Sequence, residues 1–456
     1  MDYQELLNAI QGGKTIHLCG IGGVSMRALA RLLVHMGAKV QGSDRDDSEA
    51  VKKLRAENIP VQIGHSPLNL GDASLVIRTA AIPDQNPEIV AARANGLPVL
   101  ERAQAWGLLM RGYEHAICVA GTHGKTSTTS MLSSVLIDAQ LDPTIMVGGE
   151  LPLIGGSLHI GSTDLFVAEA CEYKNSFLNF LPTIAMILNI DRDHLDFFSD
   201  TDDIIASFRK FAMLVPEEDG LVVANGENEN VLRAIENCGR RVVTFGLGEH
   251  CDVHPYCITC KNGFYSFDVI NGDQFYCSVA LKVPGEHNML NALASAAAAI
   301  RLGIPGEVFS KGLSDYTGVG RRFEYKGNFQ GAMVFDDYAH HPDEIAASLK
   351  TARSMDFKRI ICVFQPHTYS RTICLFDEFA QALSLADVVV LSEIYAARET
   401  NQSGISSRDL AAKIPGSVFA PTFEDAAAYL RSNAREGDIV FTMGAGTINQ
   451  LWDLLH

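Results

Sequence analysis

Short apolar runs alternate with amphipathic stretches along the whole chain. The apolar run TIHLCGIGG (15–23) is followed by VSMRALARLLVHMG (24–37), whose apolar residues recur every three or four positions, and then by AKVQGSD (38–44). Apolar runs of about four to eight residues are typical of buried strands, and the wider spacing is typical of helices. Strands that alternate with helices form parallel sheets, so the sequence predicts an α/β fold.

This alternation restarts twice, which divides the chain into three segments. A polar stretch at 111–114 precedes a new strand-loop-helix start, and GVGRR (318–322) is typical of a hinge. The middle segment combines strand-like runs with a cysteine-bearing, β-rich insertion and an alanine-rich helix. In the last segment GAMVFDDYA, RIICVFQP, DVVVLSEI and DIVFTMGAG are each followed by a helical pattern. Because a chain of this length exceeds one ordinary core, we expect domains over 1–112, 113–318 and 319–456.

The composition is that of a globular protein, with 47% hydrophobic and 20% charged residues. A net charge of −17 opposes binding to nucleic acid or to an anionic membrane, since both need clustered basic residues. The apolar runs are shorter than the roughly 20 residues of a membrane helix, and the N-terminus lacks the pattern of a targeting peptide. Ten cysteines without a framework spacing are typical of reduced thiols. We therefore expect a cytoplasmic protein without nucleic-acid or membrane partners, for which monomer and homodimer are both compatible with the sequence.

One cysteine cluster has the composition of a metal site. HCDVHPYCITC (250–260) contains a C-x-x-C with two histidines nearby, which is compatible with zinc. The surrounding sequence alternates like strands, however, and in an extended strand Cys257 and Cys260 would point to opposite faces. No second C-x-x-C completes a site, so structural thiols are the favoured interpretation.

The stretch AICVAGTHGKTSTTSMLSSVL (116–136) resembles a phosphate-binding loop with two residues missing. The usual pattern needs a glycine at position 119, where this chain has valine. Glycines 121 and 124 still allow backbone N–H groups to point at phosphate, and the following helix adds its dipole. Lys125 supplies a charge and Thr126 a hydroxyl for Mg²⁺. The alternative is an ordinary strand-to-helix turn, but the position between strand and helix favours a nucleotide site.

Two further strand ends carry acidic residues or histidine. LFVAEACE places Glu169 at the end of an apolar run, and ILNIDRDHLDFF places Asp191, Asp193 and His194 at the end of another. Ligands of open parallel sheets bind beyond the carboxyl ends of the strands. Mg²⁺ usually takes one or two carboxylates with phosphate and water, whereas imidazole is a less usual ligand. We predict a Mg²⁺ site here; the alternative for His194 is packing on a neighbouring phenylalanine.

The N-terminal GIGGVSM follows a strand and opens a helix, with Asp44 at the end of the next strand. This resembles the G-x-G-x-x-G fingerprint of dinucleotide-binding proteins and its ribose-binding acid. The third glycine position is Ser25, so the fingerprint is incomplete. A dehydrogenase that also carries a Lys-Thr phosphate loop would be unusual. We interpret this loop as a diphosphate site for another nucleotide.

Taken together, these residues resemble the ATP-dependent Mur ligase family, which adds amino acids to a UDP-linked sugar acid in peptidoglycan precursor synthesis. The motifs, in chain order, are HLCGIGGVSM, AGTHGKTSTT, VAEACE, NIDRDHLD, PGEHNMLNALAS, GVGRRFE, DDYAHHP, QPHTYSRT and MGAG. The shortened GTHGKT loop is that family's own form. The resemblance implies three α/β domains: an N-terminal Rossmann-like UDP-sugar-binding domain, a central P-loop-type ATP-binding domain and a C-terminal Rossmann-like amino-acid-binding domain.

HLCGIGG, DDYAHHP and QPHTYSRT occur together, and within the family this combination implies a particular reaction. The expected enzyme uses ATP and Mg²⁺ to join L-alanine to the lactyl carboxylate of UDP-N-acetylmuramate through an acyl phosphate. It would serve cell-wall synthesis, and with it cell shape and division. The alternatives are the family's tripeptide ligase, a folylpolyglutamate synthetase-like enzyme, an NAD-dependent oxidoreductase and a nucleotide-regulated binding protein without turnover.

The resemblance also implies roles for individual residues. For ATP they are Gly121, Thr122, His123, Gly124, Lys125, Thr126, Ser127, His287, Asn288 and Asn291, and for Mg²⁺ they are Thr126, Glu169 and His194. For the UDP-sugar they are Gly20, Ile21, Gly22, Gly23, Ser25, Met26, Asp44, His65, Thr79 and Ala80. The hinge, amino-acid and acyl-phosphate region would contain Arg321, Tyr338, His340, His341 and Arg371. The expected catalytic residues are Lys125, His194, Arg321, His340, His341 and Arg371.

Two positions depart from the family pattern. Relatives commonly read D-E-S-D where this chain has Cys171-Glu172-Tyr173-Lys174, and an aspartate often stands where this chain has Thr447. Glu169 is retained, so we expect the metal site to be intact. The attacking amine must lose a proton, and His340 or His341 has the pKa range for this role. Anchoring of the substrate is the alternative role for both.

Overall fold

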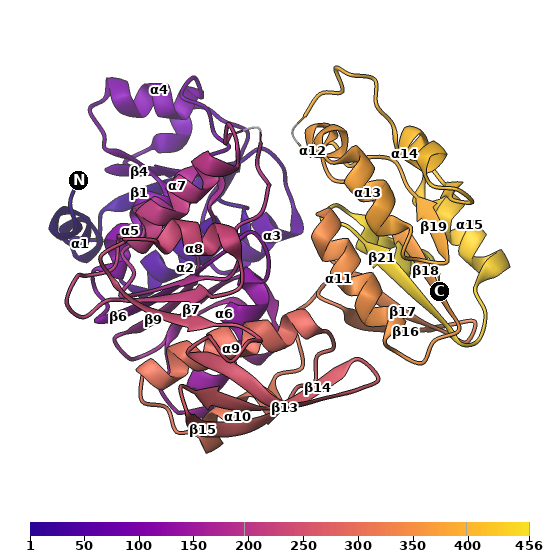
Figure 1. The fold of residues 1–456 in the computed structure, drawn as a ribbon. Helices are drawn as coiled ribbons and strands as arrows, with labels where there is room; N and C mark the ends of the chain where they lie inside the picture. The colour runs from indigo at the N-terminus through magenta and orange to yellow at the C-terminus, as the bar shows by residue number, and fades with distance from the viewer. Residues whose placement is uncertain (196, 398, 456) are drawn as a thin grey trace.

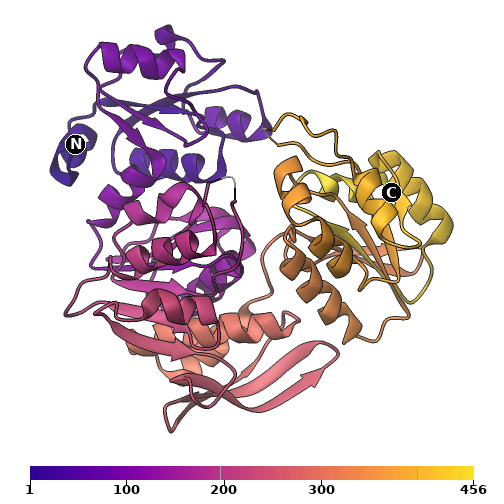
Figure 2. The same cartoon turned by 45° about the horizontal axis from the view of Figure 1, so that its top comes forward.

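Three separate β-sheets organise the chain. The computed structural model describes residues 1–195, 197–397 and 399–455. The sheets have five, ten and six strands and follow one another along the sequence. Figures 1 and 2 show the first two sheets stacked on one side of the molecule and the third on the other side. The α/β class and the three-part architecture predicted from the hydrophobic pattern are confirmed.

The N-terminal sheet is entirely parallel, with strand order β3-β2-β1-β4-β5. The strand order reverses at β1, and the crevice beyond the carboxyl ends of the strands at such a switch point is the usual ligand site of this fold. The glycine loop follows β1, so it lies at this point. The strands are β1 Thr15–Cys19, β2 Lys39–Asp44, β3 Val61–Ile63, β4 Leu75–Arg78 and β5 Val99–Glu101, and the helices are α1 Tyr3–Gln11, α2 Val24–His35, α3 Glu49–Ala56, η1 Pro67–Leu70, α4 Pro87–Ala94 and α5 Arg102–Met110.

The central sheet has the order β15-β14-β13-β12-β11-β10-β6-β9-β7-β8. Its middle strand β6 is buried almost throughout and leads into the phosphate loop and helix α6. The strands are β6 His115–Ala120, β7 Thr144–Leu151, β8 Gly156–His159, β9 Leu165–Glu169, β10 Ile184–Ile187, β11 Leu221–Asn225, β12 Arg241–Phe245, β13 Val253–Lys261, β14 Phe264–Asn271 and β15 Gln274–Ala280. The helices are α6 Lys125–Asp138, η2 Pro152–Ile154, η3 Tyr173–Asn179, α7 Thr201–Ala212, α8 Glu229–Ile235, α9 Glu286–Arg301 and α10 Gly306–Asp315.

The cysteine-bearing insertion is the antiparallel extension β13-β14-β15 of this sheet. A bulge follows Tyr256, and Cys257 adopts a φ of +51°. The bulge breaks the two-residue alternation on which the sequence argument about opposite faces depended. Cys257 and Cys260 are both exposed free thiols.

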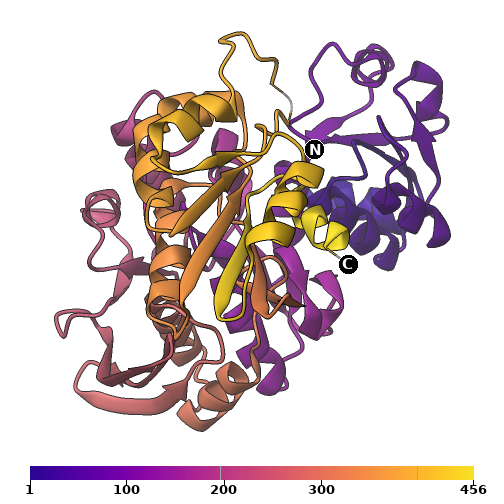
Figure 3. The ribbon, with the colours of Figure 1, turned by 90° about the vertical axis from the view of Figure 1, so that its right-hand side faces the viewer.

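The C-terminal sheet has the order β16-β17-β21-β18-β19-β20, and only its edge strand β16 is antiparallel. Helices cover both faces of this sheet: α11, α13 and α14 pack on one face, and α15 and η4 pack on the other (Figure 3). Alternate residues of β18 point to the two faces and belong to the two cores. The strands are β16 Glu324–Phe329, β17 Ala332–Asp337, β18 Arg359–Phe364, β19 Val388–Leu391, β20 Val418–Phe419 and β21 Asp438–Met443, and the helices are α11 Pro342–Arg353, α12 Tyr369–Cys374, α13 Phe376–Leu383, α14 Ser407–Lys413, α15 Phe423–Asn433 and η4 Ile448–Leu454.

The helices of the described ranges are all too short or too polar to cross a bilayer.

Candidate active site

The phosphate loop is held in shape by the end of the neighbouring strand β10. The backbone N–H of His123 donates to Asn189 Oδ1 at 2.7 Å, and Asn189 Nδ2 donates back to the His123 carbonyl at 3.0 Å. Thr122 Oγ1 accepts from the Asp191 N–H at 2.8 Å. Gly124 has a φ of +84° and immediately precedes α6, so a left-handed residue turns the chain into the helix. These contacts fix the shape of the loop.

Two of the three predicted metal ligands are in contact. Parallel pairing of β6 with β9 sets Glu169 opposite Val119, and Thr126 Oγ1 donates to Glu169 Oε2 at 2.9 Å. The Gly148 N–H donates to the same oxygen at 2.7 Å, and a Cβ on Gly148 would lie 2.6 Å from it. A hydroxyl and a carboxylate are hard oxygen donors, so this pair fits Mg²⁺. His194 lies on the far side of Glu172, with Nε2 3.7 Å from Glu172 Oε1.

Lys125 binds two backbone carbonyls and a carboxylate, and the sequence predicted none of these partners. Its Nζ donates to the carbonyls of Gly121 and Thr122 and forms an ion pair with Glu172 at 3.1 Å. Burial by itself would lower the pKa of Lys125, but the charge of Glu172 prevails and raises the pKa above its usual value. Lys125 is therefore a full cation at neutral pH.

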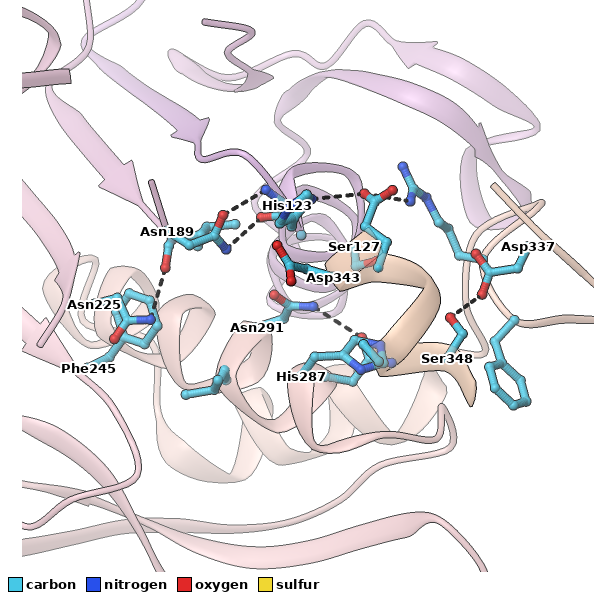
Figure 4. Close-up of a pocket in the computed structure, with 18 residues that line it drawn as sticks. His123, Ser127, Asn189, Asn225, Phe245, His287, Asn291, Asp337, Asp343 and Ser348 are labelled. Atoms are coloured by element: carbon cyan, nitrogen blue, oxygen red, sulfur yellow. Dashed lines mark hydrogen bonds and ion pairs between the residues drawn. The ribbon is translucent and has the colours of Figure 1, made fainter. Parts of the chain in front are cut away.

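A cavity of about 230 Å³ adjoins the phosphate loop (Figure 4). Six of the predicted nucleotide residues line it: His123, Gly124, Ser127, His287, Asn288 and Asn291. Asn291 Nδ2 donates to Asn288 Oδ1 at 3.2 Å, and Asn288 Nδ2 donates to the Pro284 carbonyl at 2.8 Å. Burial, and then the charge of Arg322, lower the pKa of His287 to about 4, so its ring is neutral at neutral pH. On the side of the central domain, the cavity therefore presents neutral polar groups suited to a base and a sugar.

The C-terminal domain contributes to the same cavity. Arg322, Phe323, Asp337, Asp343, Glu344, Ala347 and Ser348 line it from that side. Ser348 Oγ donates to Asp337 Oδ2 at 2.7 Å and the Ala339 N–H donates to Oδ1 at 2.9 Å. Burial raises the pKa of Asp337 to about 6 despite these bonds. Asp337 stands in the DDYAHHP motif, but no role was predicted for it, although its position at the carboxyl end of β17 is a signal for a ligand contact.

A second cavity of about 540 Å³ lies where all three domains meet. One arginine comes from each domain: Arg45 follows β2, Arg192 follows β10 and Arg371 lies on α12. Arg371 pairs with Asp193 at 3.0 Å. Burial alone would raise the pKa of Asp193, but Arg371 and nearby histidines hold it well below its usual range. Three arginines against two carboxylates, Asp193 and Glu399, leave the lining with a net positive charge, which suits an anionic ligand.

Among the predicted residues, His194 and Arg371 line this cavity. His367 and Tyr395 line it too, with their rings stacked at 5.7 Å, and neither was predicted. His367 stands in QPHTYSRT just beyond the end of β18, and this position is the signal that could have identified it. Burial, and then the charge of Arg371, lower its pKa to about 4, so the imidazole is neutral at neutral pH.

His340 and His341 are instead gathered around Glu344, at the start of α11. Both backbone N–H groups donate to Glu344 Oε2, at 3.0 and 3.3 Å, and His123 Nδ1 lies 3.2 Å from Oε1. Burial lowers the pKa of His340 to about 3. Burial also acts to lower the pKa of His341, but its hydrogen bond with Asp343 and the neighbouring carboxylates raise it overall. This cluster joins the C-terminal domain to the phosphate loop.

Arg321 does not line either of these two cavities. It adopts a φ of +60°, and its guanidinium donates to Asp336 Oδ2 at 2.9 Å and to the carbonyls of Gly444 and Gly446. Its side chain also lies over the ring of Tyr338. In this structure Arg321 fixes the hinge to the MGAG turn, and its neighbour Arg322 faces the nucleotide cavity.

The N-terminal glycine loop is closed by backbone and side-chain contacts. The N–H groups of Gly20 and Ile21 donate to the Ser43 carbonyl, and the Gly22 N–H donates to Asp44 Oδ2 at 2.8 Å. A Cβ on Gly22 would lie 2.8 Å from this same oxygen, so any residue other than glycine at position 22 would collide with Asp44.

The other predicted sugar-side residues surround this loop. Ser25 Oγ accepts from the Trp106 indole at 3.1 Å, and Met26 is buried in the core, so only its backbone reaches the loop. The Thr79 N–H donates to the Cys19 carbonyl, which sets the turn containing Ala80 beside the loop. Gly23 is the residue before α2.

His65 belongs to a buried network that the sequence did not reveal. Glu88 is fully buried on α4, and its Oε2 lies 3.2 Å from His65 Nδ1, 3.3 Å from His17 Nε2 and 2.9 Å from Cys19 Sγ. Ser43 Oγ donates to the same oxygen at 2.6 Å. Burial alone would raise the pKa of Glu88, but these hydrogen bonds hold it well below its usual range. The network fixes the carboxyl ends of three neighbouring strands under the loop.

Comparison with known proteins agrees with this geometry. Three family models match successive parts of the chain: Mur ligase family, catalytic domain, at residues 15–114; Mur ligase middle domain at 119–299; and Mur ligase, glutamate ligase domain, at 321–446. The chain belongs to the Mur ligase family.

Individual Mur ligases are similar over nearly the full length. The UDP-N-acetylmuramate–L-alanine ligase of Clostridium novyi (strain NT) is 45% identical over 445 residues, with 97% of each chain covered. The crystal structure of the UDP-N-acetylmuramate–alanine ligase of Thermotoga maritima has a TM-score of 0.82 and 31% identity, covering 97% of this chain and 98% of that one. A murein peptide ligase from Psychrobacter arcticus 273-4 shares the fold, with a TM-score of 0.74, 24% identity and coverage of 97% and 98%. The oxidoreductase alternative rested on the N-terminal loop alone and is not favoured by these relatives.

Replacing Gly124 by alanine is expected to weaken nucleotide binding to this Mur ligase about tenfold or more. The added Cβ would lie 2.7 Å from Asn291 Oδ1, so this side chain of the nucleotide cavity would have to move, and about 1.4 kcal/mol of lost interaction corresponds to a tenfold change in Kd. Calorimetric titration with ATP measures the change. Gly155→Ala is the matched control, because Gly155 is also left-handed, at +64°, and its Cβ would meet nothing within 4 Å. An equal loss of affinity in both variants would contradict the expectation.

His340→Asn is expected to reduce the loss of stability on acidification. The ordinary pKa of histidine is about 6.5 and the folded-state pKa of His340 is about 3, so between these values the unfolded chain binds the extra proton. Stability is then full above about pH 6.5 and falls as the pH decreases, by at most about 1.4 kcal/mol per pH unit. Denaturant unfolding of wild type and variant at pH 6 and pH 5 compares the two slopes. Identical slopes would show that His340 is not held neutral.

Proposed function

We propose that this Mur ligase joins L-alanine to the lactyl carboxylate of UDP-N-acetylmuramate at the expense of ATP, in the cytoplasm and with Mg²⁺ as cofactor. The proposal rests on one observation above all: Lys125 of the phosphate loop is connected through Glu172 and His194 to a cavity to which each of the three domains contributes an arginine. A UDP-sugar acid carries a diphosphate and a carboxylate, so it suits such a cavity. Relatives with this named activity match along the whole chain.

The reaction requires a carboxylate to become an electrophile. ATP supplies the phosphoryl group that turns it into an acyl phosphate, and Mg²⁺ reduces the repulsion between phosphate and carboxylate. Lys125 is in position to bind phosphate oxygens, while Thr126 and Glu169 would hold the metal. His194, at the boundary between phosphate loop and large cavity, would bind a second ion near the carboxylate.

The residue that orients the incoming amine has to face the large cavity. His367 does, and its Nδ1 lies 3.3 Å from Arg371 Nη1, whereas His340 and His341 are directed to the Glu344 cluster. We assign amine orientation to His367, because an imidazole with a pKa of about 4 is too weak a base to take a proton from an ammonium group. His340 and His341 then position the C-terminal domain against the phosphate loop, with His341 Nε2 3.2 Å from the Arg192 carbonyl.

The proposed activity is tested by ADP release with UDP-N-acetylmuramate and, in separate reactions, L-alanine, glycine, L-serine or the tripeptide L-alanyl-γ-D-glutamyl-meso-diaminopimelate. Turnover is expected with L-alanine, and the Lys125→Ala variant should lose it, which excludes a contaminating ATPase. Turnover with the tripeptide alone would overturn the proposal in favour of a tripeptide ligase. Absence of turnover with every acceptor would favour a binding protein.

His367→Asn is expected to lower kcat by up to about a hundredfold without weakening ATP binding, because the amine would no longer be held in position for attack. The ring lines the large cavity and does not line the nucleotide cavity, so the two effects separate. Steady-state kinetics and ATP titration measure them, with the exposed His35→Asn as control. A variant with normal kcat would remove His367 from the mechanism.

A further inference from the structure

Glu172 is a buried carboxylate at the place where a phosphate loop normally receives phosphate. Its side chain is 3% exposed, and its two oxygens lie 3.1 and 3.3 Å from Lys125 Nζ. It also lies 3.7 Å from His194 Nε2. The residue stands in Cys171-Glu172-Tyr173-Lys174, the segment that departs from the D-E-S-D pattern but keeps its glutamate.

The ion pair uses up the hydrogen-bonding capacity of Lys125. A lysine ammonium has three N–H donors. They are directed at the Gly121 carbonyl, the Thr122 carbonyl and Glu172. The two carbonyls belong to the loop itself, so Glu172 is the partner that a phosphate oxygen can replace. Phosphate and Glu172 therefore compete for one donor.

This competition has an electrostatic consequence. Glu172 is almost completely buried, and a buried carboxylate that loses its cation leaves an uncompensated charge, which is strongly unfavourable. Glu169 is a second carboxylate close enough to raise the pKa of Lys125. Metal-free ATP would thus add negative charge beside two acidic side chains. A divalent cation that arrives with the nucleotide supplies the positive charge that Glu172 loses.

The backbone after Glu172 holds the side chain in place. Lys174 and Asn175 both adopt left-handed conformations, with φ of +53° and +55°, which is unusual for residues other than glycine. Ser207 on α7 donates to Asn175 Oδ1, and the ring of Tyr173 lies 4.8 Å from that of His194. Strained backbone fixed by its surroundings is typical of functional segments.

We propose that Glu172 is the counter-ion of Lys125 that a phosphate oxygen must replace, and that it makes the phosphate loop select metal-bound over metal-free ATP. Metal-bound ATP would replace Glu172 on Lys125 and supply the positive charge that Glu172 and His194 would then face. This inference rests on the proposed function only in that ATP is the nucleotide.

The test is calorimetric titration with ATP, once in EDTA and once with excess MgCl₂. Wild type is expected to bind the metal-bound form far more tightly. Glu172→Gln keeps the shape but removes the charge, so the Kd for metal-free ATP should fall about tenfold while the Kd for metal-bound ATP does not fall. The ratio of the Kd for metal-free ATP to the Kd for metal-bound ATP should therefore decrease. Glu236→Gln, at an exposed position after α8, is the matched control and should keep the wild-type ratio.

An unchanged ratio in Glu172→Gln, or an equal loss of affinity for both forms, would overturn the proposal and leave Glu172 a structural ion-pair partner. Glu172→Asp provides a second variant in case the first does not fold: it retains the charge but withdraws it from Lys125 by about one bond length, so the ratio should shrink less. A wild-type ratio in this variant would also contradict the proposal. If the wild type shows the expected preference for metal-bound ATP but no turnover with L-alanine, the proposed reaction is refuted and the role of Glu172 stands.

Discussion

A lysine ammonium buried at the start of α6 is the charge around which the active site is arranged. Burial of Lys125 would be unfavourable without anionic partners, and the parallel sheet supplies them because β9 and β10 end on either side of β6. Glu169 ends the first of these strands, and Glu172, the ion-pair partner of Lys125, follows three residues later; His194 comes from the loop after the second strand. The same geometry that stabilises the cation in the free protein creates a site for phosphate and a divalent metal.

The domains meet through ion pairs close to this charge. Arg371 of the C-terminal domain binds Asp193 of the central domain, and Glu344 on α11 lies against His123 of the phosphate loop. Both contacts involve residues next to predicted ligand positions. These contacts place charged groups of the C-terminal domain directly against the phosphate loop and the loop after β10. The mostly polar character of these contacts is typical of interfaces between domains that move.

Local patterns were sufficient to predict ligand residues that lie close together in the sequence or at the ends of strands. The phosphate loop lies within a few residues, so GTHGKT after an apolar strand was enough to predict Lys125 and Thr126 as ligand residues. The strand-end rule predicted Glu169 and His194 as metal ligands, because the carboxyl ends of parallel strands share one edge of a sheet. At the hinge, adjacent arginines in GVGRR cannot be told apart by sequence: the side chain of Arg321, which has a left-handed φ, binds within the C-terminal domain, while Arg322 faces the nucleotide cavity.

The sequence by itself determined the α/β class and the order of the three segments, and it predicted residues for a nucleotide and metal site, because periodicity and glycine placement are properties of neighbouring residues. The tertiary structure alone decided which distant side chains meet. It joined Glu88 on α4 to His17 and His65, brought His367 and the three arginines to one cavity, and set Glu172 on Lys125. Such pairings depend on strand order and domain docking, and these arise from packing across the whole chain.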